Sequence, residues 1–146
     1  MELTSPAFQD GASIPPKHTC DGQDVSPPLS IAEVPEGTKA LALVMDDPDA
    51  PGGTFDHWLV WNIPPDVERV PEATEPEGVQ GRTDFGRMGY GGPCPPGGTH
   101  NYRFKLYALD EELDLAQGAR KRDLQAAMEG HILAEALLQG SYSRRR

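Results

Sequence analysis

Two apolar runs that flank one polar, proline-rich loop place the strongest constraint on how this chain can fold. Residues 39–45 and residues 58–63 are mostly apolar on both alternating faces, which indicates two strands buried on both sides. Strands that follow each other in sequence are usually neighbours in space. If these two pair antiparallel through residues 48–56, the end of the first meets the start of the second at one rim of a sheet. The sequence therefore predicts that Asp47 and His57 lie close together at that rim.

A segment rich in glycine and proline leads directly into a third predicted strand. Residues 102–108 alternate in the manner of a half-buried strand, and His100 has the same parity as Tyr102, so both point to one side. Glycines let a loop turn several backbone N–H groups toward one point, and prolines hold it stiff, which makes such loops good anion receptors. The loop and the two histidines that begin strands predict a site that captures a small anion.

These residues are part of a wider set of motifs that resembles one protein family. The sequence resembles the phosphatidylethanolamine-binding protein family, in its bacterial and archaeal branch that is often called Raf-kinase-inhibitor-like. The resemblance spans nearly the whole chain. The matching pieces are Thr-Cys-Asp-Gly at 19–22, Ser-Pro-Pro-Leu at 26–29, Val-Pro-Glu-Gly-Thr at 34–38, Asp-Pro-Asp-Ala-Pro at 47–51, Gly-Pro-Cys-Pro-Pro at 92–96 leading to His-x-Tyr at 100–102, and Ala-Met-Glu-Gly-His at 127–131.

The resemblance implies a fold, an activity and a set of site residues. The expected fold is mostly β, with antiparallel sheets in a Greek-key sandwich and one or two short helices, one of them near the C-terminus. The expected activity is non-catalytic binding of phosphate, a phosphorylated headgroup or a similar anion, without a cofactor, and modulation of a kinase or other signalling protein. The ligand-binding residues carried over by position are Asp47, Ala50, Pro51, His57, Gly92, Pro93, Cys94, Pro95, Pro96, His100 and Tyr102.

The polar residues of the predicted pocket have expected roles, and His57 and His100 supply hydrogen-bond donors and charge to the anion. Asp47 accepts a hydrogen bond from a histidine, which sets the tautomer of that ring and favours its protonated form. Tyr102 donates a phenolic hydrogen bond, and the backbone N–H groups of Gly92 and Cys94 complete the cradle. The three prolines of the loop lack this donor and serve as rigid walls. The resemblance also implies a cis peptide bond before Pro51.

The sequence departs from the family pattern at two positions that bear on these expectations. Asn101 stands between the pocket histidine and tyrosine, where arginine is common, so the rim lacks a basic side chain. Ile31 stands where an aromatic residue is common, which concerns local packing. The first departure therefore affects the preference for a headgroup, and the second does not.

The length and net charge of the chain limit the functions that it can have. At 146 residues the chain is expected to form one domain, residues 1–146, because domains commonly run to about 100–150 residues. The net charge of −10 repels the phosphate backbone of nucleic acid and an anionic membrane surface. No stretch is long enough to span a membrane. A nucleic-acid partner and integral membrane association are therefore not expected, and a homodimer stays open.

The cysteines and the N-terminus bear on the expected location. Cys20 and Cys94 are the two cysteines of the chain, and they are either reduced thiols or a single bridge. The N-terminus has neither a basic start nor an apolar core of the kind that a signal peptide shows. We therefore expect a cytoplasmic protein.

The C-terminal part is expected to contain a helix and a closing strand. Leu124, Met128 and Ile132 fall on one helical face, which predicts a helix over residues 121–134. Gly130 lies inside this range and lowers helix stability by about 1 kcal/mol relative to alanine, so we expect a neighbouring strand to pass close to it. Residues 136–143 are predicted as a strand, and residues 144–146 as a solvated tail.

Several other interpretations compete with the anion pocket. Asp47, His57 and His100 can form a hydrolase site with Thr99, Tyr102 or Cys94 as the nucleophile, but no Gly-x-Ser-x-Gly elbow is present. The same residue types with Cys94 suit zinc, although their spacing is scattered. A third alternative is an inhibitor of a kinase or protease that acts through its surface. Each histidine can also simply complete hydrogen bonding at a strand end. We predict a binding protein rather than an enzyme, with no metal.

Overall fold

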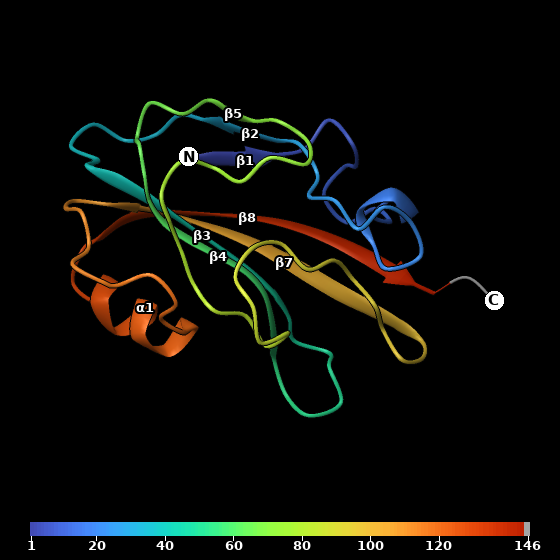
Figure 1. The fold of residues 1–146 in the computed structure, drawn as a ribbon. Helices are drawn as coiled ribbons and strands as arrows, with labels where there is room; N and C mark the ends of the chain where they lie inside the picture. The colour runs from blue at the N-terminus through green and yellow to red at the C-terminus, as the bar shows by residue number, and fades with distance from the viewer. Residues whose placement is uncertain (145–146) are drawn as a thin grey trace.

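The computed structural model describes residues 1–144, which form two antiparallel β-sheets and one α-helix (Figure 1). The smaller sheet has the order β1-β2-β5, from Glu2–Thr4, Leu29–Ala32 and Arg69–Val70. The larger sheet has the order β6-β4-β3-β7-β8, from Val79–Gln80, Phe55–Ile63, Ala40–Asp47, Thr99–Leu109 and Ile132–Ser143. Helix α1 spans Lys121–Met128, and a short 3-10 turn spans Pro16–His18. A mostly β fold with a helix near the C-terminus was predicted from the sequence and is confirmed.

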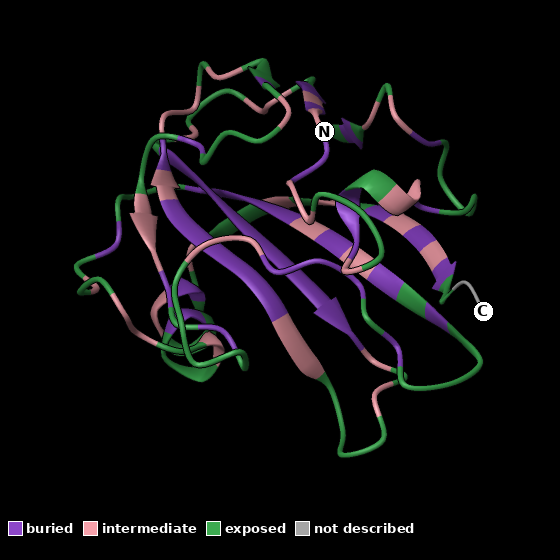
Figure 2. Cartoon of the chain, turned by 45° about the vertical axis from the view of Figure 1, so that its right-hand side comes forward, coloured by how far each residue is buried: buried purple, intermediate pink, exposed green. Residues whose placement is uncertain are grey.

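The elements are arranged in layers, with the smaller sheet over one face of the larger sheet and α1 under the other (Figure 1). Apolar side chains from both sheets, among them Leu3, Ile31 and Phe104, pack between them. A second cluster fills the space between the larger sheet and α1, where Trp61 meets Leu124. Strands β3 and β4 lie between the two clusters and are buried along most of their length (Figure 2). This explains why both strands are apolar on both faces.

The predicted pairing of the first two long strands is confirmed. β3 and β4 run antiparallel, and Asp47 lies opposite Phe55 at the rim. The register shifts within this ladder, because Met45 pairs with Trp58 whereas Asp46 pairs with Asp56. One residue of β4, His57, is therefore extra, which is a β-bulge. The bulge lets His57 and Phe55 face the same side of the sheet as Asp47.

The C-terminal elements differ from the expectation. α1 ends at Met128, not at residue 134, and β8 already begins at Ile132. Gly130 adopts φ +82° in the turn between them, a conformation that glycine adopts without strain, and a Cβ placed there would meet no atom within 4 Å. The expected close strand at Gly130 is therefore wrong.

The predicted tail lies mostly outside the described residues. Arg144 is described, and its Nε lies 3.5 Å from Asp21 Oδ1. Residues 145 and 146 are not among the described residues. Within the described chain, no helix has the length and apolar character needed to cross a membrane.

Candidate functional site

A pocket of about 220 Å³ opens at one end of the larger sheet, where the hairpin between β3 and β4 meets the start of β7. Its walls come from three parts of the chain: that hairpin, the segment before β7, and a loop around residue 85. The lining residues are Asp47, Ala50, Pro51, Phe55, His57, Phe85, Cys94, Pro95, Pro96, His100 and Tyr102. The structure thus brings together every residue that the sequence predicted for this site except Gly92 and Pro93.

His57 is held by a pair of hydrogen bonds to a neighbouring loop. Its Nδ1 lies 2.7 Å from the carbonyl oxygen of Gly91, and the Gly91 N–H donates to the His57 carbonyl at 3.1 Å. Because a carbonyl only accepts, Nδ1 carries the proton, and Nε2 makes no hydrogen bond within the described chain. Burial lowers the pKa of His57 below its usual 6.5, against the opposing effects of the Gly91 carbonyl and Asp47. The ring is therefore neutral near pH 7.

His100 is oriented by a carboxylate. Its Nδ1 donates to Asp47 Oδ2 at 2.7 Å, and both side chains are almost fully buried. Asp47 Oδ1 accepts the N–H of Asp49 at 2.8 Å, and Asp49 in turn accepts the backbone N–H of Asn101 at 2.8 Å. The prediction that Asp47 would accept a hydrogen bond from a histidine is confirmed. Asn101 helps to fix the hairpin to the start of β7 instead of supplying charge at the rim.

Tyr102 places a hydroxyl group in the lining of the pocket. The residue is buried, and its hydroxyl lies near the Cys94 backbone and the Asp47 carboxylate but makes no hydrogen bond of standard geometry among the described residues. Burial, together with the nearby Asp47 charge, raises the pKa of Tyr102, so the hydroxyl keeps its proton. The His57 ring meets the Tyr102 ring edge-on, with centroids 5.3 Å apart. A buried hydroxyl without a well-formed hydrogen bond is costly unless a ligand or water completes it.

An aromatic wall beside His57 was missed by the sequence analysis. The rings of Phe55 and Phe85 lie 4.9 Å apart, and each lies within 5.2 Å of the His57 ring. Phe55 could have been found, because it has the same parity as His57 and lies two residues before it. Phe85 lies in a loop and shows no periodicity. It reaches the pocket because Asp84 exchanges hydrogen bonds with the backbone of Asp56.

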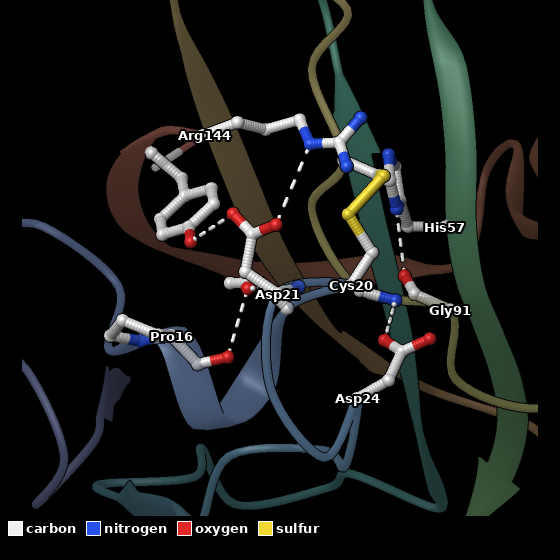
Figure 3. Close-up of a disulfide and its surroundings, with 11 residues drawn as sticks. Pro16, Cys20, Asp21, Asp24, His57, Gly91 and Arg144 are labelled. Carbon is white, nitrogen blue, oxygen red and sulfur yellow. Dashed lines mark hydrogen bonds and ion pairs between the residues drawn. A yellow bond between two sulfur atoms is a disulfide. The ribbon is translucent and has the colours of Figure 1, made fainter. Parts of the chain in front are cut away.

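A disulfide between Cys20 and Cys94 joins the pocket wall formed by residues 94–96 to the loop that follows the 3-10 turn (Figure 3). The Cys20 N–H donates to the Pro93 carbonyl at 3.1 Å, and the Gly92 N–H donates to Asp24 Oδ1 at 2.8 Å. Gly92 and Pro93 are therefore buried behind the wall, and the Gly92 N–H, one of the two that were expected to face a ligand, is already occupied. Because the Cys94 sulfur is in a disulfide, it serves neither as a nucleophile nor as a zinc ligand in this form.

Two further sequence expectations can be compared with the structure. No peptide bond between the described residues is cis, so the expected cis bond before Pro51 is wrong. The described residues also contain no group of three or more histidine, cysteine, aspartate or glutamate side chains arranged to hold a metal ion. The pocket is thus built from two histidines, one carboxylate, one phenol and apolar walls.

Comparisons with known proteins agree with this architecture. Residues 4–143 match the family model described as phosphatidylethanolamine-binding protein. A UPF0098 protein of Methanothermobacter thermautotrophicus is 54% identical over 150 residues, covering 99% of both chains, and one of Pyrococcus abyssi is 49% identical over 99% of this chain and 86% of its own. The crystal structure of a putative phosphatidylethanolamine-binding protein homolog, CT736 of Chlamydia trachomatis, superposes with a TM-score of 0.96 at 43% identity over 99% of this chain and 97% of that one. The crystal structure of Escherichia coli YbcL, a member of the same family, superposes with a TM-score of 0.91 at 35% identity, over 99% of this chain and 98% of that one.

Proposed function

Because the chain belongs to the phosphatidylethanolamine-binding protein family, we propose that its pocket binds a small anion, such as phosphate or a phosphorylated headgroup, without chemically converting it. One observation carries the proposal. Two histidines line a single pocket, and each uses its Nδ1 in a hydrogen bond to a protein acceptor, which leaves its Nε2 for a ligand. The buried Tyr102 hydroxyl beside them makes no hydrogen bond of standard geometry among the described residues. Such convergent, unused polar groups within apolar walls are typical of small-ligand sites.

The fixed Nδ1 protons determine how an anion would be held. In a neutral ring whose proton is on Nδ1, Nε2 is an acceptor, so it cannot donate to a fully deprotonated anion. The ring must gain a proton, or the ligand must bring one. Burial disfavours protonation of His57. A phosphate monoanion meets this requirement, because its own P–OH can donate to Nε2.

Sulfate affinity is expected to fall as pH rises, because sulfate brings no proton and its charge does not change between about pH 5.5 and pH 8. Binding then requires proton uptake by His57, whose pKa in the free protein lies below 6.5. If binding takes up one proton, the sulfate affinity should fall roughly tenfold for each pH unit above that pKa. Calorimetry in buffers with different ionisation enthalpies measures the uptake directly. An affinity that is independent of pH would contradict the role of His57.

The binding proposal itself is tested by calorimetric titration with phosphate and with phosphorylethanolamine. His57→Ala and His100→Ala are each expected to abolish saturable binding at millimolar ligand, because each removes a polar group that faces the pocket. His131→Ala is the matched control, since His131 pairs with Asp110 and Glu111 away from the pocket. No saturable binding by the unmodified protein up to 10 mM of either ligand, roughly the weak limit of specific recognition, would refute the proposal.

The finer expectations about partners and location stay predictions. A kinase or protease partner and a homodimer rest on the sequence and the family resemblance. The cytoplasmic location also stays a prediction, and the disulfide bears on it. Such bonds persist mainly in oxidising compartments, although intracellular proteins of hyperthermophiles are an exception.

A further inference from the structure

A network of ion pairs lies on the side of the larger sheet that faces away from the pocket. At its centre is Asp46, whose side chain is completely buried. Asp46 Oδ1 lies 2.8 Å from Arg103 Nε, and Oδ2 lies 3.0 Å from Lys105 Nζ and 3.2 Å from Lys121 Nζ. Burial alone would raise the pKa of Asp46, but its hydrogen bonds to Arg103 and Lys105, together with the charges of Lys105 and Lys121, outweigh burial and lower it. The carboxylate is therefore charged and is held by three cations from two elements, β7 and α1.

Lys121 differs from the other two cations because it bridges two carboxylates. As the first residue of α1, it also places Nζ 2.6 Å from Asp56 Oδ1. That oxygen is buried and accepts no hydrogen bond of standard geometry, so Lys121 is its partner among the described residues. Burial raises the pKa of Asp56 despite this contact. A carboxylate in this setting depends strongly on the cation beside it.

The two carboxylates lie directly opposite each other on neighbouring strands. Asp46 of β3 pairs with Asp56 of β4, immediately next to the bulge. Like charges at directly opposed positions destabilise a sheet. At this point the ladder is already weakened, because a bulged residue takes no part in regular pairing. Without a cation between them, repulsion between the two carboxylates would weaken this part of the ladder.

The positions that follow these carboxylates are pocket residues. Asp47 follows Asp46, and the bulged His57 follows Asp56. The Asp56 N–H also donates to the Asp84 carboxylate, and the Asp56 carbonyl accepts the Asp84 N–H. Asp84 directly precedes Phe85 of the pocket wall. Any movement of Asp56 would therefore be transmitted to both His57 and Phe85.

We propose that Lys121 is a positioning residue for the pocket: by bridging Asp46 and Asp56 from the far side of the sheet, it holds the bulge that turns His57 toward the ligand. The effect of Lys121 on affinity rests on the proposed anion binding, whereas its effect on the orientation of His57 does not. Lys121 does not line the pocket. It acts only through the strands that carry the pocket residues.

The experiment compares two lysine variants that both lose a contact to Asp46. Lys121→Met removes the bridge to Asp56, whereas Lys105→Met leaves that bridge intact. In the ligand-free state, the ring resonances of His57 are expected to shift in Lys121→Met and to stay in place in Lys105→Met. Phosphate affinity should fall roughly tenfold in the first variant, a loss of the size seen when residues that orient metal ligands are removed, and less than about twofold in the second. Equal effects of the two variants would overturn the proposal.

A double variant tests the cause of the effect. Asp56→Asn removes the like charge opposite Asp46, so Lys121→Met combined with Asp56→Asn should recover most of the affinity and the unshifted His57 resonances. If the double variant stays as weak as Lys121→Met, repulsion between the carboxylates is not the cause and the proposal fails. If the unmodified protein does not bind phosphate, the proposed function fails, and the ring resonances of the ligand-free variants still decide the positioning role.

Discussion

Loss of the Cys20–Cys94 disulfide is expected to lower the free energy of unfolding by about 4 kcal/mol. The bond joins residues 74 positions apart, so it closes a long loop. Much of its stabilisation is attributed to the unfolded chain, which can adopt fewer conformations while the loop is closed. Guanidinium unfolding of the oxidised protein and of a Cys20→Ser/Cys94→Ser variant measures the difference. The unfolding free energy should also fall more steeply with guanidinium concentration in the variant, because its unfolded state exposes more surface.

A reductant provides the control for this measurement. Cys94 is exposed, so a dithiol should reduce the bond in the folded protein and lower the stability of the oxidised form to that of the double serine variant. The variant itself should not respond to the reductant. Because Cys94 lines the pocket, phosphate binding should weaken in parallel. A change in unfolding free energy below about 1 kcal/mol would show that the disulfide contributes little to this fold.

Gly92→Ala is expected to have the next largest effect, because it disturbs the wall that carries Cys94. A Cβ at this position would lie closer to the backbone oxygen of His18 and to Asp24 Oδ1 than real Cβ atoms approach other atoms. The wall must then move away from the loop behind it, and the hydrogen bond from the Gly92 N–H to Asp24 is strained or lost. We expect a loss of about 2–3 kcal/mol in unfolding free energy and a roughly tenfold loss in phosphate affinity.

Gly97→Ala is the matched control from the same segment. A Cβ at Gly97 would meet no atom within 4 Å, and its backbone does not adopt positive φ. Its unfolding free energy should therefore stay within about 0.5 kcal/mol of the unmodified protein. If Gly92→Ala behaves like Gly97→Ala in both denaturation and phosphate titration, the close packing of the wall against residues 18–24 does not govern the pocket.

The strand framework could be predicted because burial on both faces leaves a clear pattern. The apolar runs of β3 and β4 and the alternation of β7 follow directly from the side chains that the two clusters bury. The end of α1 could not be found in this way. Ile132 continues the helical spacing of Leu124 and Met128, and only the positive φ of Gly130 shows that the helix has already ended.

The pocket could be predicted only in part, because some of its features depend on loop conformation. The bulge at His57 changes which face the side chain takes, and no alternation pattern shows it in advance. The direction of the Gly92 N–H and the approach of Phe85 are set by contacts with Asp24 and Asp56, which are far away in the sequence. The cysteine pairing was equally open, since two cysteines permit either free thiols or a bridge.

The central claim is that His57 and His100 form one anion-binding pocket, and histidine ring NMR during titration with phosphate tests it most directly. Both rings face the same pocket and hold Nδ1 in fixed hydrogen bonds, so a bound anion should perturb the Nε2 side of both. We predict saturable shifts of these two rings with a single dissociation constant, while His131 remains unchanged. Shifts of neither ring, or of only one, at saturating phosphate would contradict the claim.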